Sequence, residues 1–306
     1  THQLRDCDAT TFVLDGEFGV GLDAFVRVEN CPKLYWIGNI EPDCSGEVIL
    51  FDAALQGHSH ADIHQTQADD TAVILYTSGT TGKPKGAELT HFNLYCNAQH
   101  VCERSCSIWP QEINILGPGH VALAALPLFH IFGQTNVQNA LLFGGGSISY
   151  LRRFYAKDAV KAIVRDAVTF FPGVPTMFFE ILYNAEARNS DLSNLQYCIC
   201  GGGPMPREVK RRFKDKFNVN IQEAYGLTET SPLTSHQRKN ETSKCGTIGK
   251  PIAGVEMQVV NEEGRQVSQG ERGEIVIRGH NIMKGYYKNP KATAHALRGG
   301  WFHSGD

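Results

Sequence analysis

The segment from Tyr76 to Gly86, YTSGTTGKPKG, combines residue types that suit the binding of phosphate. A predicted strand leads into it, and its glycines allow backbone N–H groups to turn toward an anion. Its hydroxyl side chains add hydrogen-bond donors, and Lys83 and Lys85 add positive charge. A polar loop that only joins two elements is the alternative, but this combination at fixed offsets favours phosphate binding. The predicted phosphate-binding residues are Thr77, Ser78, Gly79, Thr80, Thr81, Gly82 and Lys83.

Two common nucleotide-binding motifs do not match the sequence. GTTGKP lacks the four-residue gap between glycines of a Walker A loop, and it has Pro84 where that motif needs Ser or Thr. No GxGxxG follows a predicted strand, and GEFGVG at 16–21 has a different spacing and no helical continuation. The sequence therefore disfavours a P-loop NTPase and a dinucleotide-binding enzyme.

A second segment, QEAYGLTETS at 222–231, carries residues that can hold a nucleotide. Tyr225 offers a flat face to a base, and Gly226 allows the backbone to approach a ligand closely. The Thr228 hydroxyl can bond a phosphate oxygen, and the Glu229 carboxylate can ligate Mg²⁺. Each of these residues also occurs singly in ordinary turns.

A third segment, CICGGGPMP at 198–206, ends a predicted strand in three glycines. A planar ring can lie against bare backbone at such a place. Three glycines after a strand are a weak signal by themselves and indicate a ligand site only together with the other candidate segments.

The elements that must position these segments follow from the hydrophobic pattern. From Thr71 onward, apolar β-rich runs alternate with segments of helical period, which is typical of a sheet flanked by helices, and we expect an α/β fold. In the helix predicted over 206–217, Val209, Phe213 and Phe217 recur every four residues beneath a basic face. Strands are predicted at 72–76, 121–126, 146–150, 168–171, 195–200 and 219–223, and helices at 90–106, 133–143, 157–167, 174–187 and 206–217.

The pattern of apolar and turn-forming residues changes twice along the sequence and divides the chain into three parts. Residues 1–70 are irregular, with one predicted strand at 46–51, and we expect a leading segment of the large domain there. Residues 71–239 form the predicted α/β subdomain, which contains the candidate nucleotide-binding segments. In residues 240–306, VEMQVV and EIVIRG flank a turn-rich stretch and predict antiparallel strands of a smaller β subdomain.

Composition excludes several functional classes. The 29 Lys and Arg residues against 32 Asp and Glu leave a net charge of −3, so no basic surface for nucleic acid is expected. The apolar runs are far shorter than the roughly 20 residues of a membrane-spanning helix, although the basic helix face leaves peripheral contact with acidic lipid open. Nine cysteines without regular spacing or a secretory signal predict reduced thiols and a cytoplasmic location.

The order of the motifs resembles that of adenylate-forming (AMP-binding) enzymes. YTSGTTGKPKG is followed by QEAYGLTETS, by GTIGKPIAG at 246–254, and by GERGEIVIRGHNIMKGYYKNPKAT leading to GGWFHSGD. The resemblance covers roughly residues 70–306 and is closest to the fatty acyl-CoA synthetases (long-chain fatty acid–CoA ligases). It implies a fragment of the large N-terminal domain of such an enzyme.

The resemblance implies an AMP-forming acid–thiol ligase that uses ATP, Mg²⁺ and coenzyme A. A carboxylic acid, such as a medium- or long-chain fatty acid, displaces pyrophosphate from ATP to give an acyl-adenylate, and the thiol of coenzyme A then displaces AMP. Mg²⁺, backbone donors and lysines offset the repulsion between two anionic reactants. The resemblance makes Thr228, Glu229 and Lys83 the catalytic residues and Glu229 and Thr77 the metal ligands. It assigns adenine and ribose to Gly201, Gly202, Gly203, Pro204, Glu223, Ala224, Tyr225, Gly226 and Asp306.

LPLFHIFGQT at 126–135 and VTFFPGVPTMF at 168–178 resemble the acyl-pocket segments of the family. The resemblance implies that Phe129 and His130 wall the carboxylate end, that Gly133 leaves room beside the acyl chain, and that Val174 belongs to the apolar lining. A core histidine is the alternative for His130. No acidic residue stands there to receive an amino group, which disfavours an amino-acid adenylation domain.

Other readings stay open at this point. An aryl- or short-chain acyl-CoA ligase fits the same motifs, and a non-catalytic nucleotide-binding scaffold is a reading from another class. The chain begins at Thr1 and ends at Asp306, where the family continues into a hinge and a mobile domain with a further lysine. We therefore expect these 306 residues to bind ATP or an adenylate weakly and to turn over poorly or not at all. Nothing in the sequence indicates an oligomeric state.

Overall fold

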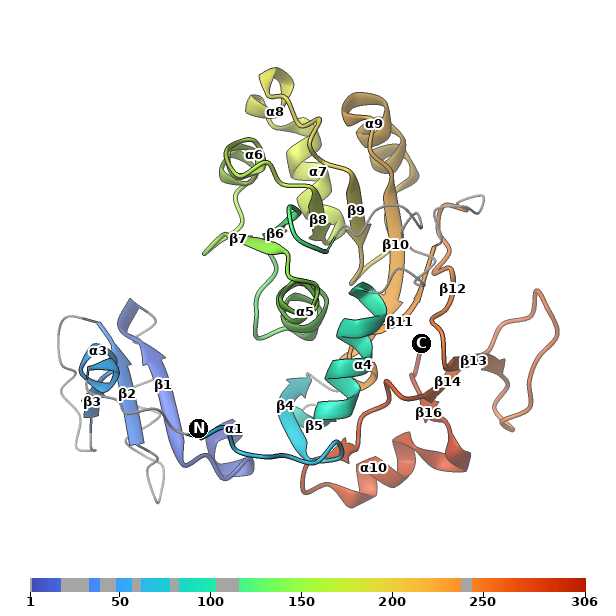
Figure 1. The fold of residues 1–306 in the computed structure, drawn as a ribbon. Helices are drawn as coiled ribbons and strands as arrows, with labels where there is room; N and C mark the ends of the chain where they lie inside the picture. Colours follow the sequence, from blue (N-terminus) through green and yellow to red (C-terminus); the bar gives the residue numbers. More distant parts are fainter. Residues whose placement is uncertain are drawn as a thin grey trace. The chain divides into compact units, whose positions relative to one another are not determined.

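Apolar runs between residues 121 and 226 form parallel strands in the computed structural model, which describes residues 2–17, 33–38, 48–56, 62–77, 83–102, 116–237 and 244–306. Together with two antiparallel strands they make a seven-stranded sheet in this part of the chain, in the order β12-β11-β10-β9-β8-β6-β7 (Figure 1). The predicted α/β fold is confirmed. The strands are β6 (Val121–Ala124), β7 (Ser147–Tyr150), β8 (Phe170–Gly173), β9 (Tyr197–Cys200), β10 (Ile221–Gly226), β11 (Leu233–His236) and β12 (Lys250–Pro251).

Alternate residues of the parallel strands face two separate hydrophobic cores, as the two-residue period of a strand requires. Phe170 and Ile199 belong to one core, whereas their neighbours Phe171 and Cys198 belong to the other. Every residue of β8 and β9 is buried, which is typical of parallel strands that are covered on both faces. We call the core of Phe170 the α4-side core and the core of Phe171 the α9-side core.

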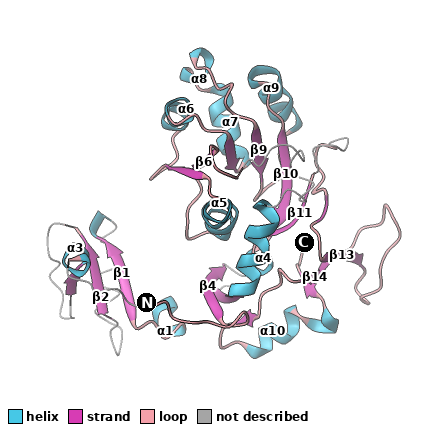
Figure 2. Ribbon diagram, in the orientation of Figure 1, coloured by secondary structure: helices cyan, strands magenta, loops and turns pink. Residues whose placement is uncertain are grey.

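Helices cover both faces of this sheet (Figure 2). Among the described residues no helix combines the length and apolarity that crossing a membrane needs. The α4-side helices are α4 (His91–Cys102), the π-helix η2 (Phe132–Asn139) and α5 (Ala140–Gly144). The α9-side helices are α6 (Ala156–Arg165), α7 (Pro175–Tyr183), α8 (Glu186–Asn189) and α9 (Arg207–Phe217).

Two of these helices show where sequence reasoning succeeds and where it fails. Val209, Phe213 and Phe217 of α9 are buried, as their spacing predicts. The helix predicted over 174–187 is instead interrupted at Asn184, whose extended backbone, with a ψ of 136°, ends α7. The side chain of Asn184 accepts a hydrogen bond from the backbone N–H of Glu186, the first residue of α8, at 2.9 Å.

A second sheet flanks the predicted phosphate loop. It consists of β4 (Thr71–Thr77), β5 (Lys85–Thr90) and β15 (Gly285–Tyr286), in the order β15-β5-β4. Strand β15 pairs antiparallel with β5 and places Tyr286 opposite Ala87. Residues from two distant parts of the sequence therefore meet next to the strand that follows the loop.

Antiparallel strands near the end of the chain make a third sheet. β13 (Val255–Val260) pairs with β14 (Glu274–Gly279), and β14 pairs with β16 (Phe302–His303). The antiparallel pair predicted from VEMQVV and EIVIRG is confirmed. The helix α10 (Pro290–Ala296) and the 3₁₀ turn η4 (Arg298–Gly300) connect β15 to β16.

The first 67 residues contain more strand than expected. β1 (Thr11–Asp15), β2 (Lys33–Ile37) and β3 (Val48–Leu50) form a parallel sheet, and the short helices α1 (His2–Asp6) and α3 (Phe51–Leu55) belong to the same region. The prediction of irregular structure around the single strand at 46–51 was wrong, because runs of five residues are too short to show a clear period. Residues 1–67 and 78–86 form one compact unit, and residues 68–77 and 87–306 form another.

Candidate active site

Two of the predicted nucleotide-binding segments lie side by side at the carboxyl ends of neighbouring strands. β9 and β10 are parallel, with Cys200 opposite Glu223, so Gly201 and Ala224 follow at the same edge of the sheet. A Cβ atom built on Gly201 would lie 3.7 Å from the carbonyl oxygen of Ala224 and 3.1 Å from the ring of Phe132. Ligands of open α/β sheets bind at this edge.

The glycines after β9 also adjoin a residue of the predicted acyl pocket. Gly202 has a φ of +74°, a conformation that glycine adopts at little cost. A Cβ atom at Gly202 would lie 3.4 Å from Cγ1 of Val174, and one at Gly203 would lie 3.7 Å from the ring of Pro175. The predicted adenine and acyl segments are therefore neighbours.

The turn after β10 admits only glycine at position 226. A Cβ atom there would lie 1.8 Å from the carbonyl oxygen of Pro232, which no small shift relieves. The hydroxyl of the buried Thr230 closes the turn, because it accepts from the N–H of Leu227 at 2.9 Å and donates to the carbonyl of Pro232 at 2.6 Å. This turn carries Thr228 and Glu229 within the 3₁₀ helix η3 (Thr228–Thr230).

The side chain of Glu229 is buried, with 8% of the residue exposed, and one of its oxygens is held by a tyrosine. The hydroxyl of Tyr286 donates to Oε1 of Glu229 at 2.8 Å. Burial of the phenol and the nearby Glu229 charge both raise the pKa of Tyr286, so this tyrosine stays a hydrogen-bond donor. Within the described residues, Oε2 of Glu229 has no hydrogen-bond partner. A carboxylate in this state fits a ligand of Mg²⁺, which binds through a few carboxylates plus phosphate oxygens.

The aromatic ring proposed for the base meets the last residue of the chain. The hydroxyl of Tyr225 donates to Oδ2 of Asp306 at 2.6 Å, although 81 positions separate the two residues. Burial and the Asp306 hydrogen bond raise the pKa of Tyr225, which keeps the proton on the phenol. Asp306 is held by its carbonyl, which accepts from the N–H of Ile275 at 3.1 Å. A base-stacking surface and a carboxylate that can accept two ribose hydroxyls therefore lie together.

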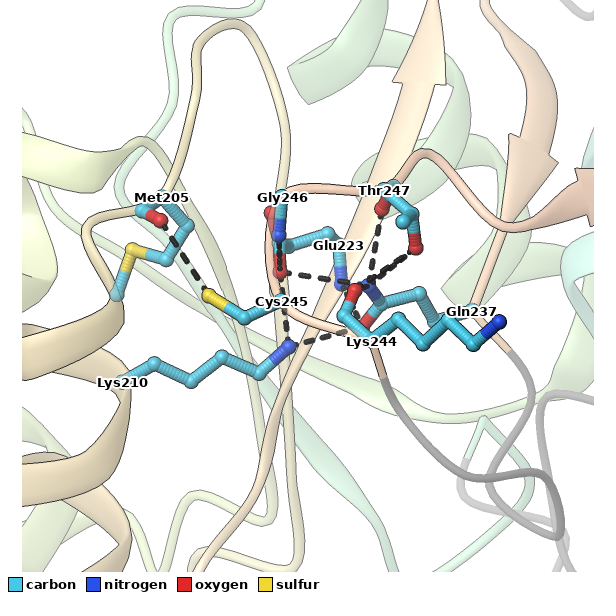
Figure 3. A network of polar contacts seen from close by, with 8 residues as sticks. All are labelled: Met205, Lys210, Glu223, Gln237, Lys244, Cys245, Gly246 and Thr247. Carbon is cyan, nitrogen blue, oxygen red and sulfur yellow. Dashed lines mark hydrogen bonds and ion pairs between the residues drawn. The ribbon is translucent and has the colours of Figure 1, made fainter. Parts of the chain in front are cut away.

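Glu223 behaves differently from its neighbours in the motif. Its Oε1 accepts from Nζ of Lys210 at 2.9 Å, from the N–H of Gly246 at 3.3 Å and from Nε2 of Gln237 at 3.3 Å (Figure 3). Nζ of Lys210 also donates to Oε1 of Gln237 at 2.9 Å. Sequence reasoning missed this buried network, and a nucleotide-binding role of the Glu223 side chain stays a prediction.

The network also holds the segment that precedes the GTIGKP motif. Nε2 of Gln237 donates to the carbonyls of Lys244 and Thr247 at 2.8 and 2.9 Å, and the thiol of Cys245 contacts the carbonyl of Met205 at 3.9 Å (Figure 3). Strand β10 and this segment are thus tied to helix α9 through Lys210.

Of the predicted acyl-pocket residues, Phe129 and His130 lie before η2, Gly133 lies within it, and Val174 precedes α7. The N–H of Phe132 donates to Nδ1 of His130 at 3.2 Å, and partial burial lowers the pKa of His130, so its imidazole is neutral near pH 7. Phe129 is 82% exposed. A Cβ atom on Gly133 would lie 2.5 Å from the carbonyl oxygen of Pro127, and the role of this glycine beside an acyl chain stays a prediction. This glycine permits close packing of η2 on the preceding turn.

The π-helix itself carries polar atoms that the sequence did not single out. Oε1 of Gln134, Oγ1 of Thr135 and Oδ1 of Asn136 are buried and have no hydrogen-bond partner in the part of the chain that the structure describes. Segments of π-helix occur often at functional sites. A helical period alone does not distinguish this geometry from an α-helix.

Most of the predicted phosphate loop, Ser78 to Gly82, lies outside the described residues. Thr77 ends β4, and Lys83 lies two residues before β5. The phosphate-binding roles predicted for Ser78, Gly79, Thr80, Thr81 and Gly82 therefore stay predictions. The described residues do connect Glu229 to β5, because Tyr286 pairs with Ala87 of that strand while its hydroxyl bonds Glu229.

Comparisons with known proteins agree with the family resemblance of the sequence motifs. A sequence model of the family described as AMP-binding enzyme matches residues 1–287. A feruloyl-CoA synthase from Amycolatopsis sp is 38% identical over 239 residues, which cover 78% of this chain and 47% of that protein. A long-chain-fatty-acid–CoA ligase from Bacillus subtilis (strain 168) is 35% identical over 238 residues, which cover 78% of this chain and 41% of that protein.

Solved structures agree with the sequence matches. The crystal structure of ATP-bound MatB from Rhodopseudomonas palustris superposes with a TM-score of 0.85 at 29% identity, and the match covers 100% of this chain and 57% of that one. The chain spans about half the length of the curated relatives it matches.

Proposed function

The chain belongs to the AMP-binding enzyme family, and from that membership we propose that it serves an AMP-forming acid–thiol ligase. In this reaction a carboxylic acid is activated with ATP to an acyl-adenylate and is then transferred to coenzyme A. The observation that carries the proposal is the hydrogen bond from Tyr225 to Asp306 at 2.6 Å, next along β10 from Ala224, whose carbonyl oxygen would lie 3.7 Å from a Cβ atom on Gly201. This arrangement suits a nucleoside, because a flat ring, bare backbone and a doubly accepting carboxylate meet at one sheet edge.

Each described side chain has a proposed task in this reaction. Tyr225 and Gly201–Pro204 enclose the adenine, Asp306 accepts the ribose hydroxyls, and the Thr228 hydroxyl bonds the α-phosphate. Glu229 holds the magnesium that arrives with ATP, and Lys83 and Thr77 belong to the phosphate loop. Magnesium supplies positive charge that offsets the repulsion between the carboxylate substrate and the triphosphate.

We propose a medium- or long-chain fatty acid as the acid substrate. The acyl segments offer apolar side chains, and the neutral His130 adds no charge beside them. Phe171 and Phe178 of the same stretch pack on each other in the α9-side core, at 5.0 Å between ring centres, so Val174 and Met177 are the better candidates for lining. Aryl and short-chain acids, amino acids and a non-catalytic scaffold are the competing readings.

The proposed cytoplasmic location is supported by the thiols. The thiols of Cys7, Cys96, Cys198, Cys200 and Cys245 form no disulfide within the described residues. Disulfides are rare in reducing compartments.

Binding of adenylate mimics tests the function and the substrate class together. The 306-residue protein is titrated calorimetrically with MgATP and with non-hydrolysable adenylates that carry a palmitoyl, octanoyl, benzoyl or aminoacyl group. We expect the fatty acyl mimics to bind most tightly, and Asp306→Asn to weaken every mimic by about tenfold, the equivalent of 1.4 kcal/mol. Preference for the benzoyl or aminoacyl mimic would overturn the substrate class. Failure to bind any nucleotide would overturn the proposed function.

Catalysis by the chain is a separate question. We propose weak or absent turnover by the 306 residues, which span about half the length of the curated relatives they match. Robust formation of acyl-CoA by the purified chain would refute this expectation.

A further inference from the structure

A four-residue segment, Met283–Tyr286, connects the turn of Glu229 to strand β5. The N–H of Met283 donates to the carbonyl of Glu229 at 2.9 Å, and the N–H of Lys284 donates to the carbonyl of Glu88 at 2.9 Å. Tyr286 then pairs with Ala87. We call Met283–Tyr286 the linking segment, because its successive groups bond alternately to the two regions.

The geometry of Tyr286 is fixed from the other side by helix α10. The N–H of Tyr286 donates to Oγ1 of Thr293 at 2.9 Å, and that hydroxyl donates to the carbonyl of Asn289 at 2.9 Å. The side chain of Asn289 caps α10 by accepting from the N–H of Ala292. A Cβ atom on Gly285 would lie 2.8 Å from Cγ2 of Thr293, so the helix and β15 pack closely. The main chain of Tyr286 is therefore held by contacts that do not involve Glu229.

The carboxylate of Glu229 needs such a partner. Both residues are 8% exposed, and a buried carboxylate is costly unless hydrogen bonds or charges stabilise it. In the described parts of the chain, the Tyr286 hydroxyl is the one group that donates to this carboxylate, and it reaches Oε1 alone. The second oxygen is thus oriented by the bond to the first. An arrangement with one oxygen fixed and one available suits the capture of a cation.

We propose that Tyr286 is a positioning residue that orients the Glu229 carboxylate toward the magnesium of MgATP. The inference rests on the proposed function, in which Glu229 holds that ion. The inference also assigns a role to the linking segment, which connects the carboxylate proposed to bind the metal to the strand that follows the predicted phosphate loop. Loss of the hydroxyl leaves the ring in place but frees the carboxylate to rotate away.

Calorimetry of the 306-residue protein with ATP, in excess magnesium and in EDTA, tests the inference without any measurement of turnover. Tyr286→Phe should weaken MgATP binding by about tenfold, since hydrogen bonds to charged groups are among the stronger ones. Binding of metal-free ATP should change by less than about twofold. We expect the thermal unfolding midpoint to be unchanged, because phenylalanine keeps the buried ring. An unchanged midpoint would show that the variant folds.

Two controls separate positioning from packing. Tyr287→Phe removes a hydroxyl from the adjacent residue, whose ring faces the Lys288 ammonium at 5.3 Å, and should leave both affinities unchanged. In a Glu229→Gln background, Tyr286→Phe should add less than about twofold, because two residues that act through one contact are not additive.

The outcomes distinguish the inference from the function on which it rests. Equal weakening of ATP with and without magnesium, or a full effect of Tyr286→Phe in the Glu229→Gln background, would assign Tyr286 to packing and overturn the inference. A normal magnesium preference in both the parent and Tyr286→Phe would overturn the inference alone. A parent protein that binds ATP equally with and without magnesium would overturn the inference together with the proposed role of Glu229.

Discussion

Replacement of Lys210 by methionine removes the positive charge at the centre of the buried network. The Lys210 and Glu223 side chains are only 15% and 10% exposed, and Nζ lies 2.9 Å from Oε1 of the glutamate. Breaking a buried ion pair from one side costs about 3–5 kcal/mol, because the remaining charge is left without compensation. Gln237 and the N–H of Gly246 still donate to Glu223 at 3.3 Å each, so we expect a loss of about 3 kcal/mol, the lower end of that range.

Equilibrium unfolding in guanidinium chloride, followed by far-UV circular dichroism, measures this loss as a shift of the midpoint at constant slope. Lys214→Met is the matched control, since Lys214 lies one turn further along α9 and is exposed. Its effect should stay within about 0.5 kcal/mol, as for most surface substitutions. The double variant Lys210→Met with Glu223→Gln should regain most of the stability, because neither charge is then buried alone.

Two results would refute this reasoning. A loss below about 1 kcal/mol for Lys210→Met would mean that solvent or the neutral donors already compensate Glu223. A double variant as unstable as the single one would mean that the methylene stem of Lys210, and not its charge, stabilises the region.

Three further predictions follow from other parts of the structure. Gly226→Ala places a Cβ atom 1.8 Å from the carbonyl oxygen of Pro232, so we expect a loss of at least about 3 kcal/mol in the same unfolding assay, together with loss of MgATP binding by calorimetry. Thr135→Val removes a buried hydroxyl that has no partner among the described residues and should raise stability by about 1 kcal/mol, and a destabilised variant would contradict the absence of a partner. The Arg165 guanidinium holds the pKa of Asp166 at about 2, below its ordinary value of 3.8, so its contribution is complete above about pH 5 and is lost as the pH falls toward 2. The stability difference between the parent and Asp166→Asn should therefore shrink between pH 5 and pH 3, and a difference that grows with acid would contradict this sign.

The segments of the candidate nucleotide site could be identified from sequence because each is a short contiguous motif at a predicted strand end. The parallel pairing of β9 with β10 brings the segments of Gly201 and Tyr225 together, and their binding roles stay predictions. The buried face of α9 could be predicted as well, since a helical period over 11 residues is a strong signal. Each of these signals lies within one stretch of sequence.

Contacts between distant stretches could not be found in this way. Glu229 and Tyr286 are 57 positions apart, and β15 has only two residues, too few for any period. Glu223 stands inside the nucleotide motif, yet its carboxylate turns toward Lys210, which no local pattern indicates. A Cβ atom on Gly133 would lie 2.5 Å from a main-chain carbonyl, and this contact depends on three-dimensional packing that no local pattern shows.

Because the large sheet has a separate core on each face, we expect mutations on its two faces to have different effects. Phe132, Val174 and Tyr225 contact the α4-side core, whereas Phe178 and Phe213 fill the α9-side core. A redesign that repacks the second group changes the α9-side core without changing the residues proposed to line the ligand. Altered substrate choice should accordingly be sought by varying the first group, and gains in heat resistance by varying the second.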